Sequence, residues 1–328
     1  MNRRLVLHML GKLLLLEAAL LVPSLLVAYY YQDDPMPFWY TIGIVLAVSI
    51  PLYLAKPNDG LELHAREGFA VVGLAWALLG AFGALPFMFS GVTVYYWDAL
   101  FETVSGFTTT GASILPQVET LPRSILFWRS FTHWVGGMGV LVLTLALMPR
   151  ISQHTTHLAR AESPGPSYSK LLPRMKDTSR VLYLLYASMT IVLFVALLAS
   201  GMPLFDSVIH AMGTAGTGGF SNRNLSVGAY NNPVAEMLIM AFMFLFGTNF
   251  FVYFCLLRGD GFKAFRNEEL RAYYGIGLGA IVLIAISILP HYGDVWTSLR
   301  HASFQVSSIM STTGFATDNF DLWPQFSR

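Results

Sequence analysis

Three short turns rich in threonine and glycine interrupt a chain that is otherwise largely apolar. They occupy residues 107–112, 216–220 and 311–315. Irregular backbone of this kind cannot face lipid, because its amide and carbonyl groups would stay unpaired; at membrane depth it persists only inside protein or beside a water-filled path. Backbone carbonyls can also replace the water shell of a dehydrated cation if they all point inward. The turns therefore suggest parts of one cation pore.

The three turns match one another without gaps when they are aligned on their last glycines, Gly111, Gly219 and Gly314. The threonines that coincide are Thr109, Thr217 and Thr312, and the small residues that coincide are Ser105, Gly213 and Ser308. Glycine tolerates the backbone angles that inward-pointing carbonyls require. The predicted selectivity filter comprises Thr109, Thr110, Gly111, Thr217, Gly218, Gly219, Thr312, Thr313 and Gly314.

The composition bounds the class of protein. The chain of 328 residues is 55% hydrophobic and 12% charged, against about 25% charged in an ordinary soluble domain, which indicates a polytopic membrane protein. The net charge of +1 gives no field that would attract nucleic acid. The one cysteine, Cys255, excludes an internal disulfide and favours a buried small residue. No nucleophile–base pair and no metal-ligand spacing stands out, so we predict neither an enzyme nor a cofactor.

The apolar segments predict transmembrane helices, because about 20 mostly apolar residues cross a bilayer. The candidates are 5–31, 38–55, 69–89, 125–148, 181–200, 234–257 and 273–290. Tyr and Trp gather at several of their ends, where interfacial anchors belong. Arg3 and Arg4 could open a signal peptide, but the apolar run that follows is too long for a typical one, so we expect a first transmembrane helix.

Lys and Arg set the expected orientation. With the N-terminus in the cytoplasm, the inner segments hold most of the basic residues, and the outer segments hold only Arg123, Arg223, Arg300 and Arg328. This bias follows the positive-inside rule and places all three turns on the outer side. The basic segment 149–180 is either simple orienting charge or a docking surface for a cytosolic partner or anionic lipid head groups.

The turns belong to a repeated unit of span, short pore helix, turn and span. We divide the chain into an N-terminal helix pair (1–60), pore repeat 1 (61–150), a cytoplasmic loop with pore repeat 2 (151–258) and a partial pore repeat 3 (259–328). A small cation path of this kind is expected to have four repeats. Repeat 3 lacks its returning span and repeat 4 is absent, so we expect a C-terminally incomplete chain. The fold class is an all-α membrane protein with a pseudo-fourfold, channel-like pore.

Several polar residues outside the turns have more than one interpretation. Asp98 and Asp206 lie near the starts of two pore helices, where we expect them to cap free amides rather than attract the cation directly. Glu17, Arg129 and His133 lie within spans, where polar groups are functional candidates. Because Arg129 and His133 lie near an outer end, they could also simply reach the interface.

Two glycine-containing segments within spans favour close helix packing. Residues 135–139 resemble a phosphate-binding loop only superficially, since no strand precedes them. Residues 247–249 have the same interpretation, with lining of an inner cavity as the alternative.

The three turns, read with their flanks at 108–113, 210–222 and 307–319, resemble the pore loops of the Trk/Ktr/HKT superfamily of potassium transporters. The TrkH/TrkG-like membrane subunits of that superfamily match best, and the helix pair 5–55 fits them. The resemblance implies K⁺ uptake through a single-subunit pore with one filter glycine per repeat. It implies K⁺ binding at Thr109, Thr110, Thr217, Gly218, Thr312 and Thr313.

The resemblance also implies partners and a location. The expected protein is a homodimer in the bacterial inner membrane, with its N-terminus in the cytoplasm, lipids around it and a TrkA-type nucleotide-binding regulatory subunit beneath it. Members of the superfamily carry a fourth filter segment that is not seen in this sequence. Two alternatives to channel-like flow stay open: a carrier that couples K⁺ to H⁺ or Na⁺, and a truncated, non-conducting membrane scaffold that binds the cytosolic partner.

Overall fold

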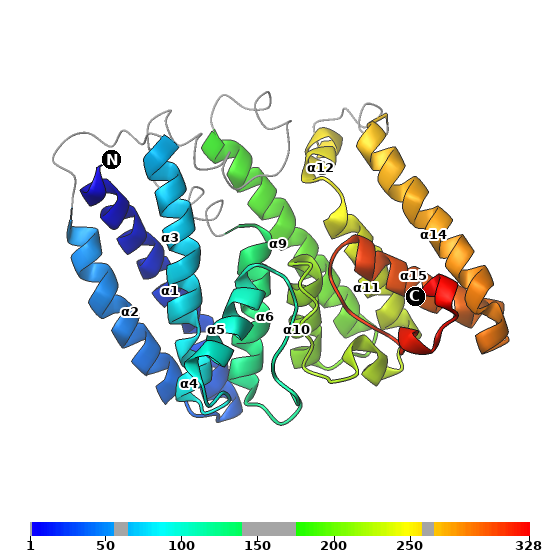
Figure 1. Ribbon diagram of the computed structural model, residues 1–328, viewed down its shortest axis with the longest axis horizontal. Helices are drawn as coiled ribbons and strands as arrows, with labels where there is room; N and C mark the ends of the chain where they lie inside the picture. The colour runs from blue at the N-terminus through cyan, green and yellow to red at the C-terminus, as the bar shows by residue number, and fades with distance from the viewer. Residues whose placement is uncertain (1, 56–64, 140–174, 258–265) are drawn as a thin grey trace. The chain divides into compact units, whose positions relative to one another are not determined.

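The computed structural model describes the chain except residues 1, 56–64, 140–174 and 258–265, and every regular element in the described part is helical (Figure 1). The chain forms two compact units. The first comprises Met1–Thr108, Ala112–Pro116 and Thr120–Leu184, and the second comprises Thr109–Gly111, Gln117–Glu119 and Leu185–Arg328. The second unit thus holds the last glycines of all three turns, Gly111, Gly219 and Gly314. The four-part division made from the sequence stays a prediction.

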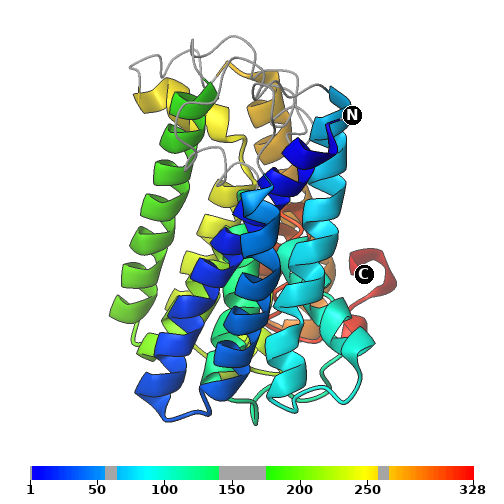
Figure 2. The same cartoon turned by 90° about the vertical axis from the view of Figure 1, so that its left-hand side faces the viewer.

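The first unit opens with the predicted pair of long helices, α1 (Arg3–Tyr31) and α2 (Met36–Leu54). Asn2 caps α1 by accepting a hydrogen bond from the Leu5 amide. The two helices pack closely because Gly11 lies directly against the backbone of Tyr53, where a side chain would collide. Figure 2 shows both helices alongside α3 (Ala65–Gly83).

The first unit also holds the first pore helix, α5 (Tyr96–Phe107), together with its remaining helices. They are α4 (Leu85–Phe89), α6 (Arg123–Gly137) and the first part of α9 (Met175–Ala199). Helix α5 packs on α3 and α6. At the second of these contacts Gly136 lies against the carbonyl of Phe107 with no room for a Cβ atom. This confirms the prediction that the glycine-rich segment of α6 serves close packing.

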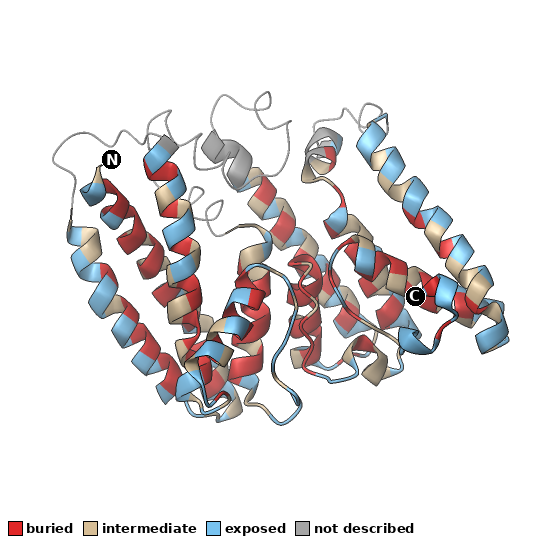
Figure 3. Ribbon diagram, in the orientation of Figure 1, coloured by how far each residue is buried: buried red, intermediate tan, exposed pale blue. Residues whose placement is uncertain are grey.

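The second unit holds the other two pore helices, α10 (Leu204–Ala215) and α15 (Val295–Met310). Around them lie the rest of α9, α11 (Pro233–Gly247), α12 (Phe250–Leu257), α14 (Glu268–Tyr292) and the short η3 (Ser226–Tyr230), η4 (Phe320–Leu322) and η5 (Gln325–Ser327). Helix α14 packs on α15 but leaves much of its apolar surface exposed (Figure 3). A helix of that kind suits contact with lipid.

In the part of the chain that the structure describes, five helices are long and apolar enough to cross a membrane. They run Arg3–Tyr31, Met36–Leu54, Arg66–Phe89, Arg180–Ala199 and Glu268–Tyr292, which matches five of the predicted spans. The predicted span 125–148 begins as α6, and its end from residue 140 lies outside the described residues. The side chain of Cys255, within α12, also lies outside the description.

The predicted continuous span 234–257 is wrong, because the chain breaks between α11 and α12. Thr248 is extended, with φ −78° and ψ 141°. Side chains replace the lost backbone hydrogen bonds of the helix. The Thr248 hydroxyl donates to the Phe244 carbonyl at 2.9 Å, and the Tyr253 hydroxyl donates to the Leu245 carbonyl at 2.6 Å. Such local partners let a helix break at membrane depth. Gly247 lies against Tyr273, as the packing interpretation predicted.

The pore helices start differently from the prediction. Neither α5 nor α10 has a side-chain cap, so the capping roles predicted for Asp98 and Asp206 are wrong. The Asp206 carboxylate instead accepts a hydrogen bond from Asn222 at 2.6 Å. Only α15 of the three is capped, by Asp294, which accepts hydrogen bonds from the amide and hydroxyl of Thr297. These bonds hold the pKa of Asp294 below its usual range.

The contact between α1 and α2 yields a stability prediction. Replacing Gly11 by Ala would push a methyl group into the backbone of Tyr53, so we expect a loss of about 1–3 kcal/mol, measured as a fall in the unfolding temperature of the detergent-solubilised protein. The control is Gly43→Ala in α2, where a Cβ atom meets nothing within 4 Å. Equal unfolding temperatures for the two variants would contradict the packing at Gly11.

Candidate ion-selectivity site

Each predicted turn follows a pore helix at the same spacing. Helices α5, α10 and α15 end at Phe107, Ala215 and Met310, each four residues before the last glycine of its turn. The negative end of each helix is therefore adjacent to its turn, which favours a cation there by a modest amount.

The second and third pore helices end in the same hydrogen-bonded motif. In α10 the Thr217 amide donates to Thr214 and the Gly218 amide donates to Gly213. In α15 the Thr312 and Thr313 amides donate to Ile309 and Ser308 in the same way. This pair of bonds defines a Schellman cap, which needs a left-handed residue just past the helix.

That left-handed residue is a threonine in all three turns. The φ angles are 55° at Thr109, 50° at Thr217 and 60° at Thr312. A β-branched residue rarely adopts this conformation, because its side chain crowds the backbone. The same costly choice at three matching positions indicates that the threonine hydroxyl or methyl group has a use that glycine could not serve.

A second left-handed residue follows two positions later in every turn. The φ angles are 76° at Gly111, 72° at Gly219 and 86° at Gly314. Left-handed residues at alternate positions turn successive peptide planes the same way, with amides to one side and carbonyls to the other. The turns thus have the backbone that a carbonyl-lined cation site requires.

Carbonyl oxygens of neighbouring turns converge on the glycines. The Gly218 oxygen lies so close to Gly111, and the Thr313 oxygen so close to Gly219, that a Cβ atom at either glycine would collide with it. The Thr313 oxygen is also only 3.7 Å from the Cβ position of Gly111. The structure therefore brings the three predicted turns together. A Cβ atom at Gly314 would meet no described atom within 4 Å.

Hydroxyl groups of the third turn bond within the protein. Thr312 donates to the Ser311 carbonyl at 2.6 Å, and the Thr313 hydroxyl lies 2.7 Å from that of Ser311. These contacts tie both threonine side chains to Ser311. The Ser308 hydroxyl supports the turn from behind by donating to the Phe315 carbonyl at 2.7 Å.

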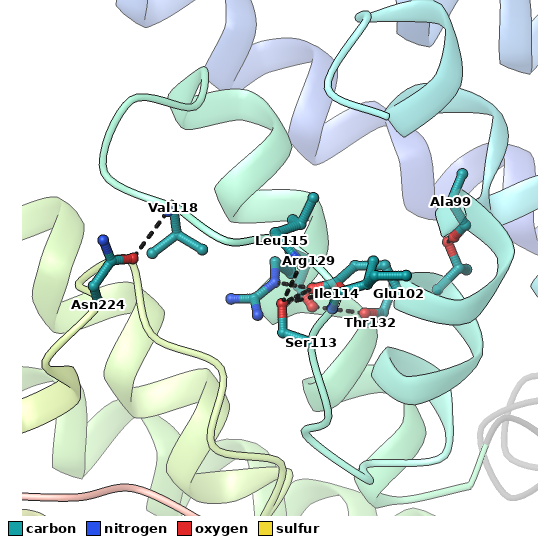
Figure 4. Close-up of polar contacts among 10 residues, drawn as sticks. Ala99, Glu102, Ser113, Ile114, Leu115, Val118, Arg129, Thr132 and Asn224 are labelled. Carbon is teal, nitrogen blue, oxygen red and sulfur yellow. Dashed lines mark hydrogen bonds and ion pairs between the residues drawn. The ribbon is translucent and has the colours of Figure 1, made fainter. Parts of the chain in front are cut away.

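The segments after the turns are joined in chain order. The Val118 amide donates to the Asn224 side chain at 3.0 Å (Figure 4), and the Asn224 amide donates to Glu119 at 3.3 Å. Farther on, the Gly228 amide donates to the Ala316 carbonyl at 3.1 Å. The loop after the first turn is thus tied to the second, and the loop after the second is tied to the third.

Side chains of the pore helices bond the extended segments that follow the turns. The sequence analysis did not predict these contacts. Glu102 of α5 bonds Ser113, and His210 of α10 bonds Ser221, both at 3.0 Å. His301 of α15 bonds Thr317 at 3.0 Å. The available signal was positional, because Glu102 and His210 each stand nine residues before the glycine of their turn.

The polar residues of the spans are buried. Arg129 is 4% exposed and forms an ion pair with Glu102, and His133 is fully buried. The interpretation that they reach the interface is therefore wrong. Glu17 is also fully buried, and neither of its carboxyl oxygens has a hydrogen-bond partner among the described residues. Within the described residues, no three His, Cys, Asp or Glu side chains form a group that could hold a metal ion.

Helices of membrane-spanning length define a membrane protein, and the convergence of the three turns suits a cation path through it. Residues 37–275 match the family TrkH, cation transport protein. The Trk system potassium uptake protein TrkH of Salmonella typhimurium is 37% identical, over 99% of this chain and 69% of its own length. TrkG of Escherichia coli is 34% identical, over 98% and 67%.

A solved structure is similar as well. The crystal structure of the potassium transporter TrkH from Vibrio parahaemolyticus matches all of this chain and 68% of its own chain, with 30% identity and a TM-score of 0.87. The chain therefore belongs to the TrkH family of cation transport proteins, as its turns and helix pair predicted.

The convergence at Gly219 yields a test. In Gly219→Ala, the left-handed φ costs about 1 kcal/mol and the methyl group collides with the Thr313 carbonyl, so we expect Rb⁺ uptake to fall at least about tenfold. Gly293→Ala is the matched control, since Gly293 has φ 70° but open space at its Cβ position. The control should lose similar backbone stability and keep uptake. Normal uptake in Gly219→Ala would remove Gly219 from the cation path.

Proposed function

We propose that this protein takes up K⁺ across the bacterial inner membrane through a selective path lined by the three turns. The proposed filter residues are Thr109, Thr110, Gly111, Thr217, Gly218, Gly219, Thr312, Thr313 and Gly314. K⁺ would bind at the carbonyls or hydroxyls of Thr109, Thr110, Thr217, Gly218, Thr312 and Thr313. The observation that carries the proposal is the repeated left-handed Thr and Gly pair, with carbonyls of one turn directed at the glycine of the next.

The names of the relatives support the same ion. Those relatives are potassium uptake proteins of the Trk system and a potassium transporter. We extend the proposal to the rest of that setting: an N-terminus in the cytoplasm, a homodimer surrounded by lipids, and a TrkA-type nucleotide-binding regulatory subunit.

A carrier that couples K⁺ to H⁺ is the second candidate. Glu17 favours it, because its carboxyl is fully buried in a helix of membrane-spanning length and has no hydrogen-bond partner among the described residues, and ionisable groups within membrane spans mark proton relays. Channel-like flow is favoured over coupling by the backbone carbonyls of the turns, which need no proton to bind a cation.

Uptake by cells tests the proposal. Expressed in cells that lack K⁺ uptake, the protein should admit Rb⁺, and K⁺ should compete with Rb⁺ at concentrations at least about tenfold below those of Na⁺. Proton uptake in fixed ratio to Rb⁺ would select the carrier. Protein that reaches the membrane and admits no Rb⁺ would leave only the scaffold interpretation.

Binding of the regulatory subunit is tested at the basic segment 149–180, most of which lies outside the described residues. Arg174, Lys176 and Arg180 lie at the start of or just before α9. Neutralising all three to Gln should weaken co-purification of the cytosolic nucleotide-binding subunit, because charge attraction would be lost. The control neutralises Arg123 and Arg223, which we place on the outer side. Undiminished co-purification at physiological salt would move the docking surface elsewhere.

A further inference from the structure

One carboxylate, that of Glu102 on the first pore helix, bonds the segment that follows the first turn. The Ser113 hydroxyl donates to both oxygens of Glu102, at 3.0 and 3.2 Å, and the Ile114 amide donates to Glu102 Oε2 at 3.1 Å (Figure 4). Ser113 and Ile114 are the second and third residues after Gly111. So short a connection transmits their position directly to the carbonyls of the turn.

Arg129 of α6 completes the arrangement. Its Nε lies 2.5 Å from Glu102 Oε1, and the two side chains are 4% and 0% exposed. A buried ion pair is costly to desolvate unless further hydrogen bonds satisfy its lone pairs. Here the carboxylate accepts from a guanidinium, a hydroxyl and an amide. Charge-assisted bonds of this kind are shorter and stronger than neutral ones.

The second turn repeats the geometry with different chemistry. His210 occupies the position of Glu102, and its Nε2 lies 3.0 Å from the hydroxyl of Ser221, the counterpart of Ser113. His210 is fully buried, and its Nδ1 is 2.8 Å from the Asp206 carbonyl. In the third turn Gln305 and Ala316 occupy the two positions, so no such serine exists there.

We infer that Glu102 and Arg129 are positioning residues that set the cation selectivity of the first turn, with His210 in the same role for the second. The inference rests on the proposed function, since selectivity has meaning only for a conducting protein. The ion pair holds the Glu102 carboxylate, which bonds Ser113 and Ile114 and so fixes the position of the segment after Gly111. That position in turn sets the direction of the carbonyls at residues 109–111. If this segment were held less firmly, those carbonyls could adapt to a smaller ion such as Na⁺.

The test compares Rb⁺ uptake with and without competing Na⁺, at matched abundance in the membrane. Ser113→Ala removes the hydrogen bond from the Ser113 hydroxyl to Glu102 and leaves the buried ion pair intact, so we expect the variant to fold. Glu102→Gln combined with Arg129→Gln removes both charges together and avoids a lone buried charge. We expect Na⁺ to compete at least about fivefold better in both variants. The conservative variant Glu102→Asp, made in the native protein, should keep part of the preference for Rb⁺ over Na⁺.

Glu236→Gln is the control. It breaks another ion pair, at 3.4 Å, between the buried Glu236 and the partly exposed Arg300 of α15; Glu236 does not bond a segment that follows a turn. It should lower abundance and leave the preference for Rb⁺ unchanged. If the native protein is selective while Ser113→Ala and the double variant keep its Rb⁺ to Na⁺ preference, the inference fails and the proposed function stands. If the native protein admits no Rb⁺, the proposed function itself fails.

Discussion

The close approach of carbonyl oxygens to glycine backbones is the constraint on which the site depends. Gly111 and Gly219 leave room for the carbonyls of Gly218 and Thr313, and no other residue could do so without moving a turn. The left-handed φ angles reinforce this, because they turn the carbonyls to one side. Two independent requirements, space and conformation, thus select glycine at the same positions.

The rest of the second unit follows from that constraint. The carbonyls can converge only if each pore helix stops at a fixed place, and the Schellman caps of α10 and α15 provide the stop. The segments that follow the turns must then be held in position. His210 of α10 bonds Ser221, and His301 of α15 bonds Thr317. In the first unit, Glu102 pairs with Arg129 and holds the segment after the first turn through Ser113. Backbone geometry makes the site, and buried polar side chains keep it in place.

The sequence predicted what depends on local pattern and missed what depends on distant partners. Hydropathy found the long helices, and the register of Thr109, Thr217 and Thr312 located the turns. The break at Thr248 was invisible, because it is stabilised by the Tyr253 hydroxyl rather than by a change in hydropathy. The role of Arg129 was also missed, since its partner lies on another helix, twenty-seven residues away.

The most direct test is a crystal structure of the protein soaked in Tl⁺, a heavy stand-in for K⁺. The arrangement of the turns predicts anomalous density on the side where the carbonyls of Gly218 and Thr313 converge, at coordination distance from backbone oxygens of residues 109–111, 217–219 and 312–314. Exchange of Tl⁺ for Na⁺ should remove that density. Tl⁺ bound only by side chains away from the turns, or turns empty at saturating Tl⁺, would contradict the assignment of the filter.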